Sequence, residues 1–238
     1  MKFKKLIFLS FILFSLLVAC DTQEKDPAFY EMEQFINDLM KEMTLEEKIG
    51  QLTLYTSDMD HTGPFVRDQY IDEIKAGHVG AIFNAYTAEY TYNLQKMAVE
   101  ETRLGIPMLF GYDVVHGHRT IFPMPIGETA TWDLDAIEQS ARISAIEATA
   151  EGLHWTFSPM IDVTRDPRWG RIAESSGEDP YLTTQVARAK VRGYQGDDLK
   201  ELNTMLATAK HFAAYGAPQA GRDYHTVDMS EITLRNNF

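Results

Sequence analysis

Residues 107–113 read Pro-Met-Leu-Phe-Gly-Tyr-Asp, a short apolar run that ends in a tyrosine and an aspartate. A run of this length, bounded by a proline and by polar residues, is typical of a strand buried on both faces of a sheet. Farther along the chain, Leu134–Gly152 carries apolar residues at helical spacing. The strand and the helix together predict one βα unit.

The same alternation continues on both sides of this unit. Three further apolar runs are predicted as strands: Val79–Phe83, Trp155–Val163 and Met205–Ala213. Their helices are predicted at Leu94–Leu104, at Tyr181–Tyr194 and from near Ser230 onward. Strands and helices alternating at this spacing predict right-handed βαβ connections and a parallel sheet. Four units fit either a small doubly wound sheet or half of an eight-stranded barrel.

Two helices are predicted ahead of the first strand. Apolar residues recur at helical spacing through Glu31–Met43. Thr44-Leu45-Glu46-Glu47 then opens a second helix, with a threonine as N-cap and a glutamate three residues later. We expect this pair to form an amphipathic lead-in to the sheet.

Residues 1–19 have the three parts of a secretory signal peptide: a basic start, an apolar run from Leu6 to Leu17 and small residues before Cys20. The run is too short to span a membrane comfortably. Leu17-Val18-Ala19-Cys20 resembles a bacterial lipobox, in which the thiol receives a diacylglycerol and becomes the new N-terminus. The alternative is an ordinary signal peptide with an incidental thiol. We expect a lipidated Cys20, a tether at 20–27 and a folded region at 28–238, in a periplasmic or outer-membrane lipoprotein of a Gram-negative bacterium.

The charge of the chain excludes several partners. Its formal net charge is −13, and loss of the signal lysines makes the remainder more acidic still. Phosphates would be repelled, so no nucleic acid is expected. No G-x-G-x-x-G follows a strand and no Walker pattern occurs, so no nucleotide cofactor is expected. A neutral carbohydrate is compatible with this charge.

No metal site is expected either. His116 and His118 are two residues apart, and His61 and His78 precede them, but no H-E-x-x-H and no cluster of carboxylates at ligand spacing accompanies them. We expect hydrogen-bonding roles for all four histidines.

Polar side chains gather where the predicted strands end. Tyr112-Asp113 follows one strand, Asp162–Arg171 follows the next, and Lys210-His211 closes the last. Charged groups at the ends of apolar strands are costly unless they are partnered or bind something. Because the carboxyl ends of parallel strands lie at one edge, these residues predict a single cleft.

Five motifs stand in order along the chain. They are Lys48–Leu52, Arg103–Pro107 leading into Phe110-Gly111-Tyr112-Asp113-Val114-Val115-His116-Gly117, Phe122–Gly127, Arg165-Asp166-Pro167-Arg168-Trp169-Gly170-Arg171, and Ala209-Lys210-His211-Phe212-Ala213-Ala214-Tyr215-Gly216. In order and spacing they resemble family 3 glycoside hydrolases of the β-glucosidase type, from about Phe29 to Arg235. The resemblance implies a (β/α)8 barrel followed by an α/β sandwich domain. This chain would form an incomplete barrel of four to five βα units.

The resemblance also implies that Asp113, Arg171, Lys210 and His211 bind the hydroxyls of a terminal non-reducing sugar. The chemistry is suitable, because a carboxylate accepts hydroxyl protons while lysine and guanidinium groups donate to the oxygens. Each residue also has a structural alternative: Asp113 as an N-cap or as the ion-pair partner of Lys210, and His211 as a hydrogen-bonded core residue. Trp169 is expected either to stack on a sugar or to pack in the interior.

Arg168 is expected to bridge to Glu174, Glu178 or Asp179 and so to shape its loop.

Members of the family retain anomeric configuration and use two carboxyl groups about 5 to 5.5 Å apart. The resemblance places the aspartate nucleophile on a later strand and the acid/base beyond the barrel. Both positions fall past Phe238, so no catalytic residue is assigned and the chain alone is expected to be inactive. For the full-length enzyme we expect release of terminal β-D-glucosyl residues.

Alternative functions remain open at this point: a β-xylosidase, an N-acetylglucosaminidase, or a carbohydrate-binding lipoprotein without catalysis. The N-acetylglucosaminidase hypothesis rests on Asp223 and His225. Their spacing resembles the Asp-His dyad that the N-acetylglucosaminidase branch of the family uses as its acid/base.

Overall fold

The computed structural model describes residues 27–59 and 69–238. The predicted signal peptide, Cys20 and His61 lie outside these residues. The chain divides into two compact units, Met1–Thr44 and Leu45–Phe238. The first contains helix α2 (Pro27–Glu42), which confirms the first helix of the lead-in and has no buried residue. The second contains the sheet and begins with α3 (Leu45–Gln51), the second predicted helix.

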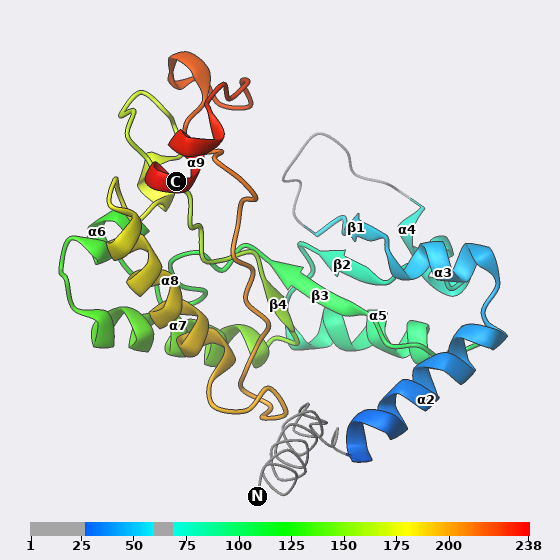
Figure 1. Ribbon diagram of the computed structural model, residues 1–238. Helices are drawn as coiled ribbons and strands as arrows, with labels where there is room; N and C mark the ends of the chain where they lie inside the picture. The colour runs from blue at the N-terminus through cyan, green and yellow to red at the C-terminus, as the bar shows by residue number, and fades with distance from the viewer. Residues whose placement is uncertain (1–26, 60–68) are drawn as a thin grey trace, which may run out of the picture. The chain divides into compact units, whose positions relative to one another are not determined.

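The sheet has four parallel strands in the order of the chain: β1 (Leu54–Thr56), β2 (Ala81–Phe83), β3 (Leu109–Tyr112) and β4 (Trp155–Thr156) (Figure 1). Ile82 at the centre of β2 lies opposite Tyr55 on one side and Phe110 on the other. Strands that follow one another in space as in sequence, each joined by a helical crossover, are typical of a barrel. The predicted α/β fold with a partial barrel is confirmed.

Three details of the strand prediction were wrong. β1 was not predicted, because it spans only three residues and lacks a fully buried side chain. The expected strand Met205–Ala213 lies parallel to β4 but pairs through isolated bridges, Trp155 with Leu206 and Met160 with Lys210. β4 itself is shorter than predicted, since Pro159 has no N–H to offer a neighbouring strand.

The helices of the second unit connect these strands. In chain order they are α4 (Tyr70–Lys75), α5 (Ala88–Glu100), α6 (Pro125–Thr129), α7 (Leu134–Thr149), η1 (Ile172–Glu174), α8 (Pro180–Gln195), η2 (Gln219–Gly221) and α9 (Glu231–Asn237). Aspartate N-caps begin the two long helices: Asp133 accepts from Ala136 N–H, and Asp179 accepts from Leu182 N–H. Ser230 caps α9 in the same way, at the predicted start.

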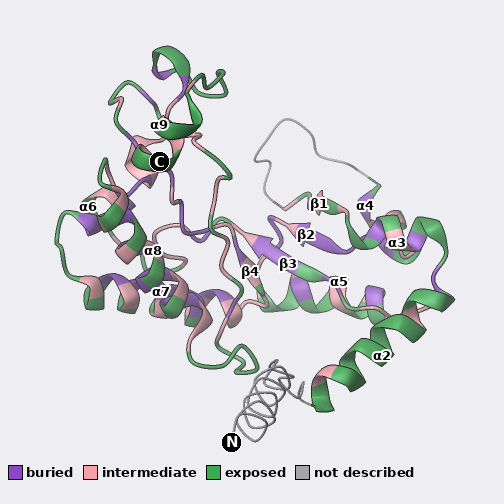
Figure 2. Cartoon of the chain, in the orientation of Figure 1, coloured by how far each residue is buried: buried purple, intermediate pink, exposed green. Residues whose placement is uncertain are grey.

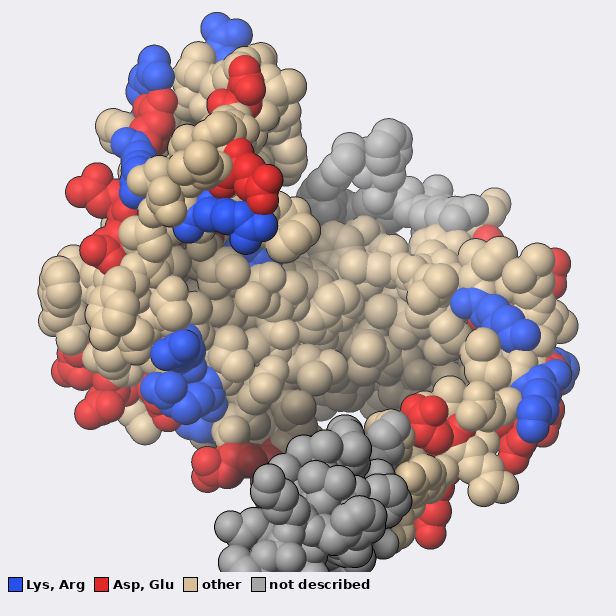
Figure 3. Space-filling view, viewed as in Figure 1, with Lys and Arg blue, Asp and Glu red and all other residues tan. Residues whose placement is uncertain are grey.

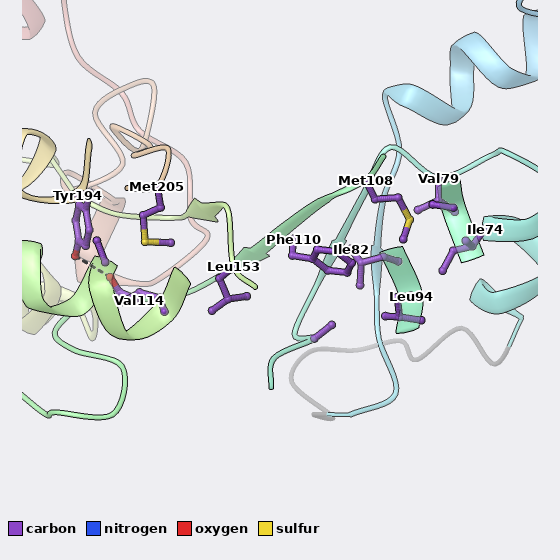
Figure 4. Packing of buried hydrophobic residues seen from close by; sticks show 14 of the residues in the cluster. Ile74, Val79, Ile82, Leu94, Met108, Phe110, Val114, Leu153, Tyr194 and Met205 are labelled. Carbon is purple, nitrogen blue, oxygen red and sulfur yellow. Dashed lines mark hydrogen bonds between the residues drawn. The ribbon is translucent and has the colours of Figure 1, made fainter. Parts of the chain in front are cut away.

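The core lies between the sheet and its helices. Buried residues of β2, β3, α4 and α5 meet there, among them Ile74, Ile82, Leu94 and Phe110 (Figure 4). The inner faces of β2, β3, α7 and α8 are buried, whereas the outer faces of the helices are exposed (Figure 2). α7 packs closely on α8 because Gly193 has no side chain: a Cβ there would lie 2.4 Å from the Glu138 carbonyl oxygen.

Within residues 27–59 and 69–238, no helix is both long and apolar enough to cross a membrane. Charged side chains of both signs lie side by side over the lobe around α9, while the surface over the middle of the sheet is largely uncharged on the same face (Figure 3).

Candidate functional site

The four sequence-predicted site residues meet at the carboxyl edge of the sheet. Asp113 directly follows β3, and Lys210 and His211 lie in the segment that runs beside β4. Arg171 directly precedes η1. Lys210 Nζ donates to Asp113 Oδ1 over 3.1 Å, and Arg171 Nη1 lies 3.4 Å from His211 Nε2. The structure therefore forms two adjoining pairs from three separate segments of the chain.

Asp113 and Lys210 form an ion pair in which the aspartate side chain is exposed to solvent and the lysine side chain is mostly buried. The lysine side chain is 15% exposed, whereas the Asp113 side chain is 54% exposed. Such a pair stiffens the loop after β3 and still presents a carboxylate to solvent. Asp113 does not act as an N-cap, because the helix that follows it, α6, has Met124 at that position.

Buried side chains donate hydrogen bonds to the backbone that directly follows Asp113. The Val114 carbonyl accepts from the Tyr194 hydroxyl at 2.7 Å (Figure 4) and from the Thr156 hydroxyl at 3.2 Å. Lys190 Nζ donates to the Val115 carbonyl at 3.3 Å. Because unpaired buried carbonyls are costly, these three donors fix the path of the chain beside Asp113.

Arg171 is oriented by a fork-shaped interaction with Glu174. Its Nε and Nη2 each donate over 2.7 Å, one to each oxygen of the carboxylate. These hydrogen bonds raise the pKa of the guanidinium and hold the pKa of the Glu174 carboxyl below its ordinary value. The third nitrogen, Nη1, remains directed at His211.

Asp162 anchors His211 from the interior. Its Oδ2 accepts from His211 Nδ1 at 2.6 Å and from the His211 backbone N–H at 3.1 Å. The Asp162 side chain is 1% exposed, against 30% for the His211 side chain. The imidazole therefore has one edge in the protein and the other toward the site.

Aromatic rings support the Arg171 and His211 side chains. The Tyr215 ring contacts His211 edge to face at 4.8 Å and lies 5.6 Å from the Arg171 guanidinium carbon. Its hydroxyl donates to Asp223, which also accepts from the indole N–H of Trp169 at 2.8 Å. Burial, followed by the contact with Asp223, raises the pKa of Tyr215 to about 12.

Trp169 is wholly buried. Its packing alternative is confirmed, and stacking on a sugar is excluded in this conformation.

Asp223 accepts hydrogen bonds from Trp169 and Tyr215 and is not paired with His225. The Nδ1 atom of His225 lies 3.4 Å from Thr226 Oγ1. Burial raises the pKa of Asp223, but the hydrogen bonds from Tyr215 and Trp169 outweigh it and leave that pKa below its ordinary value.

The expectation for Arg168 was wrong. It pairs with Asp166 in its own loop, with Nη2 2.7 Å from Oδ2, rather than with Glu174, Glu178 or Asp179. Hydrogen bonds from Arg168 lower the pKa of Asp166 to about 2. Glu174 instead forms an ion pair with Arg171, which precedes it by three residues.

The described histidines make the expected hydrogen bonds. His116 Nδ1 is 3.0 Å from the Phe122 carbonyl, His118 Nε2 is 2.9 Å from Glu151, and His78 Nδ1 is 3.1 Å from Glu73. No group of three or more His, Cys, Asp or Glu suited to hold a metal occurs among the described residues.

Sequence reasoning missed three residues of the site. Asp162 stood at the end of a predicted strand and was grouped with the polar stretch that follows, and the only available signal was that position. Glu174 is predicted as a partner of Arg168 but binds Arg171. Tyr215 belongs to a motif, but the packing of its ring on His211 depends on the turn between them and cannot be predicted from the motif.

Fold and site together define a barrel-type α/β domain with an open cluster of charged and polar groups at the carboxyl ends of its strands. The chain belongs to glycoside hydrolase family 3: residues 44–238 match the Glycosyl hydrolase family 3 N terminal domain. This confirms the family inferred from the motifs.

Relatives of known name agree with this assignment. The chain is 44% identical over 206 residues to a periplasmic β-glucosidase of Salmonella typhimurium, covering 87% of this chain and 26% of the relative. It is 32% identical over 232 residues to a putative β-xylosidase of Formosa agariphila, covering 90% and 31%. The chain thus spans about a quarter to a third of the length of these relatives.

The fold matches a solved β-glucosidase from Listeria innocua in complex with isofagomine. The TM-score is 0.79 at 42% identity, over 86% of this chain and 29% of that one. Further structures of the same enzyme contain glucose, and a mutant of it contains laminaribiose.

Proposed function

We propose that this chain supplies the glucosyl-binding part of a retaining β-glucosidase, which releases terminal non-reducing β-D-glucosyl residues from β-glucosides or oligosaccharides. The observation that carries the proposal is the convergence of Asp113, Lys210, Arg171 and His211 at one strand edge. The names of the relatives support the substrate class. No cofactor is part of the proposal.

The charges of the cluster suit a polyhydroxylated ring. Asp113 offers acceptor oxygens, while Lys210 and Arg171 offer donors that are only partly used within the protein. Each charge-assisted hydrogen bond contributes about 1.5 to 3 kcal/mol when it replaces water. Several such bonds to one sugar ring give selective binding of a neutral ligand.

The nucleophile and the acid/base are proposed to come from sequence outside these 238 residues. The purified chain is therefore expected to bind glucose or isofagomine and to leave an aryl β-glucoside intact. Binding is measured by calorimetric titration and hydrolysis by release of the aryl group. Measurable hydrolysis by this chain contradicts the division of roles, and a folded chain that binds neither sugar contradicts the assigned site.

A second candidate substrate is a β-xyloside. It is favoured by relatives named β-xylosidase and, in Dickeya chrysanthemi, periplasmic β-glucosidase/β-xylosidase at 30% identity. Xylose lacks the hydroxymethyl group of glucose, so comparing the affinities of the chain for the two sugars separates the candidates. Equal affinity indicates that the described residues do not contact that group.

We propose that the protein is exported and held at a membrane by a lipid on Cys20. Two relatives carry the word periplasmic in their names, which supports export. The anchor rests on the sequence around Cys20 alone.

A further inference from the structure

Asp162 has a buried carboxylate that accepts hydrogen bonds from His211, a residue of the proposed sugar site. It lies just beyond β4, and its Oδ2 receives both the ring Nδ1 and the backbone N–H of His211. Its other oxygen, Oδ1, is buried without a hydrogen-bond partner in the described part of the chain. A carboxylate kept at 1% exposure in this way is expensive. Its two contacts with His211 indicate what it does there.

The surrounding groups decide which nitrogen of His211 carries the proton. Arg171 Nη1 lies 3.4 Å from His211 Nε2, and a guanidinium has donors but no acceptor. Nε2 must therefore offer its lone pair. The proton of the neutral ring then sits on Nδ1, from which it is donated to Asp162. A doubly protonated ring would set an N–H against the N–H of Arg171.

The backbone makes this arrangement rigid. Ile161 N–H donates to the Lys210 carbonyl at 2.6 Å, so the segments that carry Asp162 and His211 are paired next to the contact. Gly216 lets the chain turn back closely, since a Cβ there would lie 2.3 Å from the Val163 carbonyl oxygen. The Tyr215 ring against the imidazole face limits its rotation further.

We infer that Asp162 is a positioning residue that holds His211 in the Nδ1–H tautomer, so that Nε2 acts as a hydrogen-bond acceptor in the sugar site. When a sugar binds, Lys210 and Arg171 donate to its oxygens. The Nε2 lone pair of His211, which faces Arg171 Nη1 without a ligand, then accepts a hydrogen bond from one sugar hydroxyl. The group that faces His211 must therefore be a donor. The identity of the ligand rests on the proposed function, but the tautomer does not.

The tautomer is measured directly in the chain labelled with ¹⁵N-histidine, at neutral pH. The sequence has seven histidines, and loss of one set of ring signals in His211→Gln assigns those of His211. We expect a protonated Nδ1 and an unprotonated Nε2 in the wild type. In Asp162→Ala, the ring loses its hydrogen bond to Oδ2 and can turn away from Arg171 Nη1, so the Nε2–H form should become populated.

Glu73→Ala is the matched control, because Glu73 pairs with His78 outside the site. It should change the signals of His78 and leave those of His211 in place. A wild-type His211 protonated on Nε2 overturns the inference, even if Asp162→Ala does not fold. So does a folded Asp162→Ala variant with the wild-type pattern at His211.

A sugar panel tests the consequence for recognition. Each hydroxyl of glucose is replaced in turn by hydrogen and by fluorine, which accepts a hydrogen bond weakly but cannot donate. At the hydroxyl that faces His211, fluorine should weaken binding as much as hydrogen does. At hydroxyls that accept from Lys210 or Arg171, fluorine should retain part of the affinity.

The tautomer measurement and the sugar panel test different claims, so a negative result in one does not reject the other. If the wild type shows the expected tautomer but binds no glucose, the proposed function fails and the role of Asp162 toward His211 stands. If glucose binds but fluorine is better than hydrogen at every position, the acceptor role of His211 is wrong.

Discussion

At the scale of single residues, the site depends on how each charged group is oriented. Glu174 holds two nitrogens of Arg171, and the third, Nη1, is directed at His211. The motif places an arginine at this position, but the sequence does not say which carboxylate fixes it. Arg168, three residues earlier, pairs instead with Asp166 in the tight turn of the loop. Local backbone geometry decides between such partners, and that geometry is not encoded in a pattern of residue types.

Replacing Arg171 by lysine should weaken sugar binding roughly 10- to 100-fold, which corresponds to the loss of a charge-assisted hydrogen bond of about 1.5 to 3 kcal/mol. A lysine keeps the charge but cannot make the two parallel bonds to Glu174 and a third contact at once. Calorimetric titration with isofagomine measures the change. Arg168→Lys is the control, because its pair is exposed and lies in the same loop. Equal losses in both variants contradict the assignment of Arg171.

The Arg171 to Glu174 pair should also make stability depend on pH. The folded pKa of Glu174 lies below the ordinary value of 4.5, because of the hydrogen bonds from Arg171. A depressed carboxyl pKa contributes stability that is fully present above pH 4.5 and is lost as the pH falls through the folded pKa. Since the Glu174 side chain is 31% exposed, the contribution is screened and should stay near or below about 1 kcal/mol.

The measurement is urea unfolding of the wild type and Glu174→Gln from pH 7 to pH 3. The stability advantage of the wild type should shrink on acidification. An advantage that grows toward low pH reverses the sign and rejects the argument.

At the scale of elements, α8 supports the loop after β3. Lys190 forms a buried ion pair with Glu128 of α6 at 2.7 Å, with side-chain exposures of 4% and 6%. Lys190 and Tyr194, one turn apart, both donate to carbonyls next to Asp113. The amphipathic pattern predicted the helix, but a lysine on its buried face could not be foreseen. The long-range partner that makes the burial tolerable is 62 residues away in the chain.

Lys190→Met should cost about 3 to 5 kcal/mol of unfolding free energy, because Glu128 is left buried without its counter-charge. Replacing both residues by methionine should recover much of that loss. Arg192→Met is the matched control, since Arg192 is on the same helix and its pair with Glu138 is largely exposed. It should cost no more than about 1 kcal/mol. Urea unfolding gives all three values, and equal costs for the two single variants would refute the buried-pair argument.

At the scale of the whole molecule, the alternation of apolar runs and helical patterns was sufficient to predict the parallel α/β fold, and the ordered motifs were sufficient to predict the family. The failures were in short elements. β1 has three residues and owes its place to pairing with β2, not to its own composition. The meeting of Asp113, Arg171, Lys210 and His211 was predicted from their places at strand ends and in motifs. Asp162 contacts His211 only because the fold brings together residues that are 49 apart in the chain, and Tyr215 reaches the His211 ring only through the turn between them.

The proposed attachment of the protein to a membrane depends on a single position, Cys20, the only cysteine in the chain. If Cys20 carries a diacylglycerol, cells of a Gram-negative host that express the full sequence should place the protein in the membrane fraction and label it with radioactive palmitate. One anchored lipid with its acyl chains holds a protein at a bilayer because each buried methylene contributes about 0.8 kcal/mol. Cys20→Ser should abolish the label and the anchoring, while Ala19→Gly, which keeps a small residue before the cysteine, should preserve both. A wild-type protein that is cleaved and exported but unlabelled would instead support the ordinary signal peptide, with Cys20 as an incidental thiol.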